Sequence, residues 1–255
     1  MKAPIKRLLD RYSHRFLPSL FLKIAATELS ALPREIEIPE HVIDQQLLNV
    51  FTSLAEQFPN TCFNNPTLTN SQNADEHLRE LLGFALKREK STIKEAGRGI
   101  FISGQVPAGK VLCVYPGTIY YPGDSVFINS IGNSFVLRCR DAICVDGKDS
   151  GMSKNTFISC ARRDMGHDIC DWTWMTEAPF SFFNLGQYVN NAPKLGTHNV
   201  QYMEIDVKGW PITTRKFLPY TTKASHPLPL RIVCLVSTRP IENREELFSA
   251  YISTS

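Results

Sequence analysis

The sequence predicts an α+β protein in which a helical region precedes a domain of short strands. Apolar residues recur at helical spacing between residues 40 and 87. After residue 98 they gather in short β-branched or aromatic runs divided by Gly and Pro. The 255 residues, 43% hydrophobic and 21% charged, suffice for one large domain with a substantial core. We therefore expect an N-terminal helical region with a basic start over residues 1–85, and the strand domain over 86–255.

Two amphipathic helices are expected in the first region. Between Glu40 and Phe58 every third or fourth residue is apolar, and Ala74 to Lys87 repeats the pattern. The segment Pro59–Asn73 between them is rich in Asn and Pro, which favours a loop. The apolar positions are Ile43, Leu47, Phe51, Leu54 and Phe58 in the first helix and Leu78, Leu81, Leu82 and Leu86 in the second.

Residues 1–27 form a basic start with six Lys or Arg and one acid, Asp10. We interpret it as a packed helix whose charges face water, because Pro4 and Pro18 interrupt the apolar pattern. A mitochondrial presequence and an anchor to an anionic surface are the alternatives. The predicted location is intracellular, in the cytoplasm or nucleus, with mitochondrial targeting as the alternative.

Short strands are expected after the helices. Their composition and their Gly and Pro turns favour small antiparallel sheets that curl around one another. The segment from about 149 to 183 fits neither the helical nor the strand period, which favours an irregular insertion. The expected strands are Gly99–Ser103, Val111–Tyr115, Ser134–Arg138, Asn199–Val207 and Arg231–Ser237.

Composition excludes several classes of protein. Twenty-eight basic against 25 acidic residues leave a net charge of +3, which gives no strong nucleic-acid signal, so binding through the basic tail is the last-ranked hypothesis. Seven cysteines with no CxxC pair favour reduced thiols inside a cell. The apolar run Phe16–Leu22 is far shorter than the roughly 20 residues of a transmembrane helix, so no membrane-spanning segment is expected.

Cys160, His167 and Cys170 are candidate zinc ligands. The residue types suit zinc, and His167 and Cys170 have HxxC spacing. A structural site normally needs four ligands, and the fourth would have to come from Cys139, Cys144 or elsewhere. We therefore favour free thiols and a surface histidine, and predict no metal.

Four motifs stand in order along the strand region. They are Gly97-Arg98-Gly99 before a strand, Tyr115-Pro116-Gly117 after one, Asn190-Asn191, and Glu245-Glu246-Leu247 followed by Tyr251. Each alone has an ordinary structural explanation. A glycine pair or an Asn pair forms turns, Tyr115 is common core material, and Tyr251 could be a buried aromatic pinned by its hydroxyl.

Together and in this order, the four motifs resemble the landmarks of SET-domain lysine methyltransferases. The resemblance covers about residues 84–255, two thirds of the chain. It implies a SET-like fold of small curled sheets with a C-terminal pseudoknot, in which the end of the chain passes through the loop after the Asn pair. That threading would bring residues as distant as Gly97 and Tyr251 to one site.

The resemblance also implies the chemistry. The cofactor would be S-adenosylmethionine, bound by Gly97, Arg98, Gly99, Asn190, Asn191 and Tyr251. A protein substrate would present a lysine through an aromatic channel, where Tyr251 and Tyr115 match the family's catalytic channel tyrosines. The implied activity is transfer of a methyl group to the lysine ε-amine, and the enzyme would be a transferase.

The sequence departs from the family pattern at several positions. Asn191 replaces a histidine, Gln187 an arginine and Arg244 a glycine, and Ser249-Ala250 replaces a tyrosine and an acid. No cysteine-rich segment of the kind that closes the lysine channel in many members is found in these residues, so residues 150–183 or the N-terminal helices are candidates for that wall. The alternative function is a catalytically inactive SET-like module that binds cofactor or protein. The sequence predicts neither the substrate nor the oligomeric state.

Overall fold

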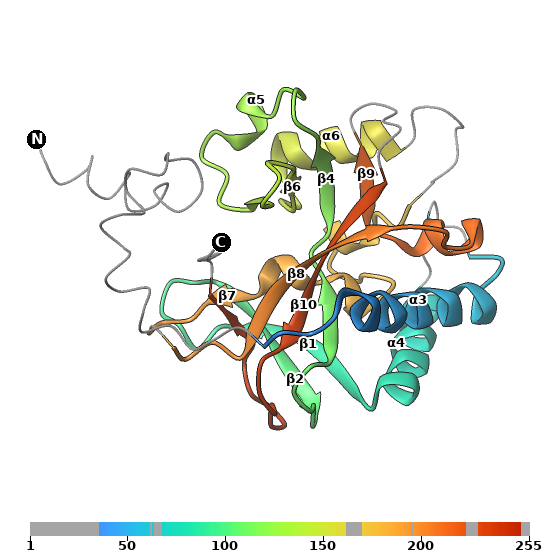
Figure 1. Ribbon diagram of the computed structural model, residues 1–255, viewed down its shortest axis with the longest axis vertical. Coiled ribbons are helices and arrows are strands. Elements are labelled where there is room, and N and C mark those ends of the chain that lie inside the picture. Colours follow the sequence, from blue (N-terminus) through green and yellow to red (C-terminus); the bar gives the residue numbers. More distant parts are fainter. Residues whose placement is uncertain are drawn as a thin grey trace, which may run out of the picture.

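The computed structural model describes residues 36–61, 63, 68–161, 170–194, 196–222 and 229–250. Residues 1–27, His167 and Tyr251 lie outside these ranges, so what was predicted for them stays a prediction. The described residues form an α+β fold, as the sequence predicts (Figure 1). None of the helices in the described ranges has the length and apolar character that crossing a membrane requires. The helices are α3 (Glu40–Gln57), α4 (Leu68–Leu82), α5 (Phe127–Ser130) and α6 (Gly151–Ala161), with 3-10 turns η1 (Thr173–Met175), η2 (Phe182–Asn184), η3 (Gly186–Tyr188) and η4 (Ile212–Phe217).

Eleven strands in the described residues make three small sheets. An antiparallel pair holds β1 (Phe84–Lys90) and β2 (Arg98–Gly104). A five-stranded sheet has the order β3-β10-β8-β11-β7, with β3 (Val111–Val114), β7 (Asn190–Asn191), β8 (Val200–Val207), β10 (Leu230–Ser237) and β11 (Phe248–Ser249). A four-stranded sheet has the order β5-β6-β4-β9, with β4 (Gly117–Tyr120), β5 (Val136–Arg138), β6 (Cys144–Asp146) and β9 (Tyr220–Thr222).

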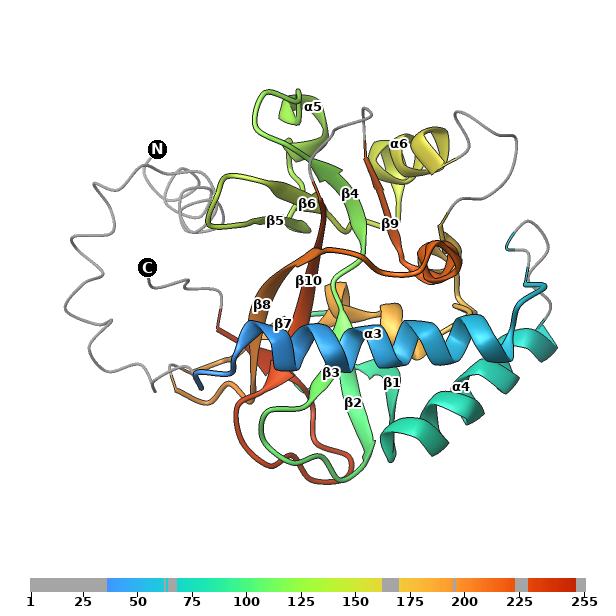
Figure 2. The ribbon, with the colours of Figure 1, turned by 45° about the vertical axis from the view of Figure 1, so that its right-hand side comes forward.

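The sheets are mainly antiparallel, as expected, but each of the two larger ones includes parallel pairing. Strand β9 pairs in parallel with β4, and β11 pairs in parallel with both β7 and β8. Figures 1 and 2 show the four-stranded sheet with α5 and α6 at the upper end of the molecule, and β1, β2, α3 and α4 below. The strand most responsible for cohesion is β10, which pairs with β8 over eight residues and also with β3.

Helix α3 packs on the strands through the face that its periodicity predicts. Ile43, Leu47 and Phe51 are fully buried. The Phe51 ring meets Phe183 edge-on at a centroid distance of 5.8 Å, and the helix also contacts β3, β8 and η4. One hydrophobic cluster contains buried residues of α3, α4 and the strands. The boundary near residue 85 between a helical region and a strand domain therefore stays a prediction, because no separate core marks it among the described residues.

The bounds predicted for the second helix are wrong at both ends. Helix α4 begins at Leu68, inside the segment expected to be a loop, and ends at Leu82. Gly83 then adopts φ +81° and donates its amide to the Arg79 carbonyl, which closes the helix. Residues 84–90, whose Leu86 continued the helical spacing, form β1 instead and pair with β2.

The segment expected to be irregular contains a helix. Helix α6 buries Ser153, Phe157 and Ala161, one residue per turn, so its sequence lacks a broad apolar face. Phe157 meets Trp174 edge-on at 5.2 Å in a second, smaller hydrophobic cluster.

Candidate functional site

The predicted glycine motif lies where the β1–β2 hairpin closes. Gly97 adopts φ +78°, and a methyl group on its α-carbon would meet nothing within 4 Å. Position 97 therefore requires glycine because of its backbone conformation and not because neighbouring atoms crowd it. The Ser91 amide donates to the Gly97 carbonyl at 3.0 Å, which closes the loop 91–97 immediately before Arg98.

Gly99 has a different reason to be glycine. A methyl group on its α-carbon would lie 2.1 Å from Oε1 of Glu246 and 3.3 Å from Nδ2 of Asn190. The space left by the absent side chain is thus filled by protein atoms from two distant segments. The motif brings Gly99, Asn190 and the C-terminal segment together, as the predicted site requires.

Asn190 links the Asn pair to the glycine motif. Its Nδ2 atom donates to the Arg98 carbonyl at 3.0 Å and to Oε1 of Glu246 at 3.4 Å. Asn191 is exposed and pairs with Ser249 in the ladder of β7 and β11. The two asparagines therefore differ: the side chain of Asn190 is engaged by protein, and that of Asn191 faces solvent.

The C-terminal segment is threaded between two earlier strands. Strand β11 lies between β7 and β8, which the loop 192–199 joins. Asn199 in that loop donates Nδ2 to the Glu246 carbonyl at 2.8 Å and accepts from the Phe248 amide at 2.8 Å. This arrangement is the predicted C-terminal pseudoknot. Tyr251 itself lies beyond the described residues.

Glu246 is the residue of this site that sequence reasoning missed. It was read as part of a motif, without a role of its own. The residue is only 4% exposed, and its carboxylate accepts hydrogen bonds from Ser91 and Thr92 as well as from Asn190. The only sequence signal was an acidic residue next to an apolar one, Leu247, which is too common a pattern to assign a function.

Tyr115 is fully buried after β3. Its hydroxyl donates to the Phe135 carbonyl at 2.7 Å, and its ring meets Tyr202 edge-on at 6.1 Å. These contacts tie Tyr115 to β8 and to the segment before β5. Its predicted role in a lysine channel stays a prediction.

A cavity of about 640 Å³ opens beside the glycine motif. Its apolar walls come from β1 and from the segment before η3, and its charged residues include both acids and bases. The lining residues are Asp75, Leu86, Lys87, Arg88, Glu89, Lys90, Gly97, Arg98, Glu177, Pro179, Phe182 and Leu185. Gly97 and Arg98 were predicted to bind a cofactor, and they line this cavity.

Glu177 joins two arginines at the cavity. Its carboxylate lies 3.0 Å from Arg88 and 2.8 Å from Arg98. Arg98 and Arg88 hold the pKa of Glu177 below its usual value. The Arg88 side chain is 10% exposed and also donates to the Tyr188 hydroxyl at 3.0 Å. Burial, followed by the hydrogen bond to Asp149, raises the pKa of Tyr188 to about 12, so this hydroxyl stays protonated at neutral pH.

Asp75 on α4 is a partly buried acid at the same cavity. Burial raises its pKa to about 6, although it accepts a hydrogen bond from the Phe182 amide at 2.9 Å. Its charge therefore changes within the range in which most assays are run.

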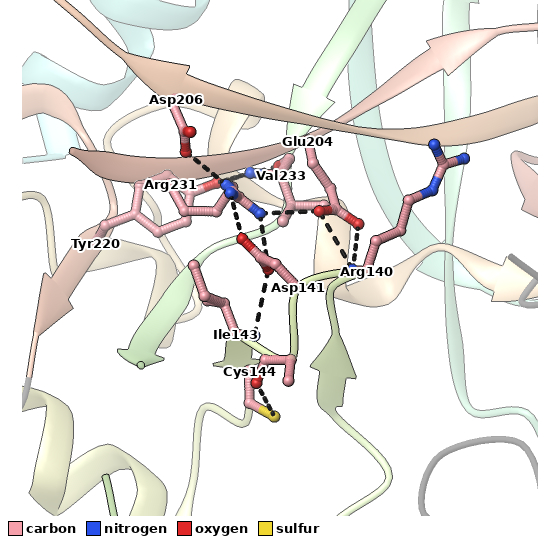
Figure 3. A network of polar contacts seen from close by, with 10 residues as sticks. Arg140, Asp141, Ile143, Cys144, Glu204, Asp206, Tyr220, Arg231 and Val233 are labelled. Carbon is pink, nitrogen blue, oxygen red and sulfur yellow. Dashed lines mark hydrogen bonds and ion pairs between the residues drawn. The ribbon is translucent and has the colours of Figure 1, made fainter. Parts of the chain in front are cut away.

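A second polar cluster surrounds Arg231 on β10 (Figure 3). The guanidinium lies 2.7 Å from Asp141, 2.9 Å from Glu204 and 2.8 Å from Asp206. Among the described residues, Cys139, Asp141 and Glu204 are also close enough to hold a metal ion together. One potential ligand atom from each lies within 4.8 Å of the other two. Arg231 already supplies the positive charge there, and burial raises the pKa of the Cys139 thiol, so the geometry is that of an ion-pair network.

The structure describes only some of the candidate zinc ligands. His167 lies outside the described ranges, and Cys170 is buried in the small cluster with Phe157 and Trp174. The set is therefore not tested by the structure.

No family model matches the sequence. SET domain-containing protein 9 of Pongo abelii and that of Homo sapiens are each 41% identical to this chain over 182 residues, which is 69% of it. The match covers 67% of the Pongo abelii protein and 61% of the human one. The chain belongs to the SET domain-containing protein 9 family.

Three sequence features predict membership of this family among SET-domain proteins. They are the basic start, the strand end Tyr115-Pro116-Gly117-Thr118 and the segment Gly186–Asn191. The identity to SET domain-containing protein 9 confirms that prediction.

Solved structures are only weakly similar. A ctPRC2 structure in an autoinhibited conformation bound to S-adenosylmethionine is 16% identical, with a TM-score of 0.34, and covers 66% of this chain and 15% of that chain. A humanized mutant of the Chaetomium thermophilum Polycomb Repressive Complex 2 bound to an inhibitor is 15% identical, with a TM-score of 0.36 and the same coverage.

Proposed function

We propose that this protein is an S-adenosylmethionine-dependent methyltransferase that modifies a lysine ε-amine of a protein substrate. The supporting observation is convergence. Asn190 contacts both the carbonyl of Arg98 and the carboxylate of Glu246, so three motifs that are distant in sequence meet at one place. That place borders a cavity lined by Gly97 and Arg98.

The residues around this cavity fit S-adenosylmethionine. A volume of about 640 Å³ is within the range of about 300–1,000 Å³ that is typical of ligand pockets. Leu86, Phe182 and Leu185 offer apolar surface for the adenine. The guanidinium groups of Arg88 and Arg98 suit a carboxylate, because arginine donates in a planar fork that matches it, and both now pair with the exposed carboxylate of Glu177, which a cofactor carboxylate would have to displace. When bound, this cofactor would supply an electrophilic methyl group.

The chain's own residues would position the acceptor and keep it reactive. A lysine amine has a pKa of about 10.4 in water and must be neutral to attack. Desolvation between aromatic rings lowers that pKa. Tyr251 and Tyr115 are the proposed channel residues, and Tyr202, whose ring contacts Tyr115, extends the aromatic surface. Alignment of the amine with the methyl group would account for most of the catalysis.

Binding of the cofactor is the first test. Calorimetry and thermal unfolding of the full chain with S-adenosylmethionine, and with its demethylated product, should show saturable binding and a higher Tm. The related nucleoside adenosine serves as a control for nonspecific binding. Absence of any response to both cofactor forms would end the proposal.

Turnover is the second test. Proteome-wide comparison of lysine methylation should reveal sites modified by the wild type but not by Tyr251→Phe. Tyr251→Phe should still bind the cofactor, because it keeps the ring.

The alternative function is a SET-like module without turnover, which binds cofactor or a protein. The burial of Tyr115, with its hydroxyl donated to the Phe135 carbonyl, favours this alternative, because a channel residue would present its hydroxyl to the substrate. A module predicts cofactor binding with no methylated lysines in the comparison above.

A further inference from the structure

Glu246 lies at the point where the C-terminal segment passes β2. The Ile102 amide donates to the Glu245 carbonyl at 3.0 Å, and the Leu247 amide donates to the Ile100 carbonyl at 2.7 Å. Glu246 is the bridge partner of Phe101 on β2. Paired residues lie on the same face of a sheet, and so do residues two apart on a strand. The Glu246 side chain therefore extends over Gly99, two residues before Phe101.

The carboxylate is surrounded by donors from two other segments. Ser91 donates its hydroxyl at 2.7 Å, and Thr92 donates its amide at 2.8 Å and its hydroxyl at 2.5 Å. Asn190 donates from Nδ2 at 3.4 Å. A carboxylate offers about four acceptor positions, so these four donors saturate it. Hydrogen bonds to a charged acceptor are roughly twice as strong as neutral ones.

The donors span both sides of the candidate site. Ser91 and Thr92 begin the loop 91–97, which ends at the glycine motif, and Asn190 begins the Asn pair. Gly99 leaves the space in which the carboxylate sits. The two chain segments predicted to bind the cofactor are thus held in place by one buried acid that belongs to neither.

We infer that Glu246 is a positioning residue that docks the loop 91–97 and Asn190 onto the C-terminal segment. The docking follows from the contacts alone, and its consequence for cofactor affinity rests on the proposed function. Glu246 is not a catalytic residue, because it acts through the loop and through Asn190. Without its carboxylate, the Thr92 amide and the Asn190 amide lose a buried acceptor, and the loop is free to open.

Three variants test the inference. Glu246→Ala removes every acceptor. Glu246→Gln can keep its one oxygen for the amide and the hydroxyl of Thr92, and its NH₂ group can then donate to the Ser91 hydroxyl. Only the weak contact with Asn190 loses its acceptor, so Glu246→Gln should rescue most of the loop. Glu245→Gln is the matched control, because Glu245 interacts with Arg239 and Asn199 and not with the loop.

Hydrogen exchange of the full chain reads the docking directly. The Thr92 amide should exchange at least tenfold faster in Glu246→Ala, about threefold faster in Glu246→Gln and within twofold of wild type in Glu245→Gln. Amides of β8 and β10 should keep their protection, which separates a local opening from global unfolding. If Glu246→Ala does not fold, the Glu246→Gln comparison decides. Unchanged exchange at Thr92 in the folded Glu246 variants, or equal effects in Glu245→Gln, would overturn the inference.

Affinity for S-adenosylmethionine, measured by calorimetry on the same proteins, reads the consequence. Glu246→Ala should bind at least tenfold more weakly than wild type, and Glu246→Gln should recover most of that loss. A wild type that does not bind would refute the proposed function but leave the exchange result to decide on Glu246. Wild-type binding with no change in Glu246→Ala would refute the link to the site.

Discussion

Asn190 donates its side-chain amide to the backbone carbonyl of Arg98 at 3.0 Å, across 92 positions of sequence. The same amide reaches Glu246 at 3.4 Å, so one nitrogen connects β2, β7 and the C-terminal segment. Asparagine suits this position because its NH₂ group offers two donors.

Replacing Asn190 should weaken the connection between these three segments. Asn190→Ala loses both hydrogen bonds and should lower the free energy of unfolding by about 1 kcal/mol. Asn190→Asp should cost at least about 2 kcal/mol, since it places a carboxylate against the Arg98 carbonyl and the Glu246 carboxylate. Urea unfolding at pH 7 measures both, with the exposed neighbour Asn191→Asp as the control, expected within about 0.5 kcal/mol of wild type. An Asn190→Asp variant as stable as Asn190→Ala would contradict the two hydrogen bonds of Asn190.

Gly99→Ala should destabilise the protein through Glu246 specifically. The added methyl group would stand 2.1 Å from Oε1 of Glu246, and such overpacking costs about 1–3 kcal/mol. In a double mutant with Glu246→Ala the clash disappears, so the combined loss should be smaller than the sum. Gly209→Ala is strained by the positive φ of +71° and is not crowded, and Gly209 lies outside the loop 91–97, so its cost should add to that of Glu246→Ala. If the losses in free energy of unfolding were additive in both double mutants, the clash between the added methyl group and Glu246 would be absent.

Asp75 should make stability depend on pH. Its folded pKa of about 6 exceeds the ordinary 3.8, so the stability gained from the protonated form is fully present below about 3.8 and is lost as pH rises through about 6. A shift of about two units corresponds to about 3 kcal/mol, which partial exposure of the carboxyl reduces to about 1–2 kcal/mol. Asp75→Asn keeps an acceptor for the Phe182 amide and should be the more stable protein at pH 7 by about that amount. Urea unfolding between pH 4 and 8 measures this, and a carboxyl that titrates near 4 by NMR would contradict it.

Arg231 should give a pH dependence of the opposite sign. Burial acts to raise the pKa of Asp141, but the hydrogen bond and charge of Arg231 outweigh burial and lower it. The stability from this pair is therefore present above about pH 4, and it is lost as pH falls through the folded pKa. Arg231→Met should lower the free energy of unfolding at pH 7 by about 2 kcal/mol, which is modest for a buried charge because its acidic partners are partly exposed. At pH 3 the loss should be smaller. Arg138→Met, on the β5–β6 hairpin whose turn holds Asp141, is the control. A difference in stability between wild type and Arg231→Met that does not change with pH would refute the argument.

Tyr115→Phe should separate a structural from a functional tyrosine. Loss of the hydrogen bond to the Phe135 carbonyl should lower the free energy of unfolding by about 1 kcal/mol. Affinity for S-adenosylmethionine should stay within twofold of wild type, because Tyr115 does not line the cavity. Methylated lysines that disappear in this variant, at unchanged cofactor affinity, would support a role in the lysine channel. A stability equal to that of wild type would contradict the contact.

Sequence reasoning located elements that have a clear period and clear ends. Helix α3 and strands β8 and β10 lie within one residue of their predicted bounds. It failed where one period imitated another, since Leu86 continues a helical spacing but lies on β1. It also failed for α6, which buries a single line of side chains and therefore resembles a loop in sequence.

The candidate site shows a similar division. The glycine motif and Asn190 could be predicted because a known order of motifs includes them, and the structure brings them together. The role of Glu246 could not, since it depends on Ser91, 155 positions away, and nothing local marks that partner. Tyr251 and Asn191 keep the roles that the sequence predicts for them, as proposals.

The insertion of β11 between β7 and β8 also orders assembly in time. Residues 248–249 can find their neighbours only after the two flanking strands are close enough to receive them, and contacts of such long sequence separation form slowly. A chain cleaved within 238–244 would keep the β3-β10-β8 arrangement and lack Glu246. A synthetic peptide carrying the missing piece could then be added in trans, which would make competence to bind ligand a reversible property of two fragments.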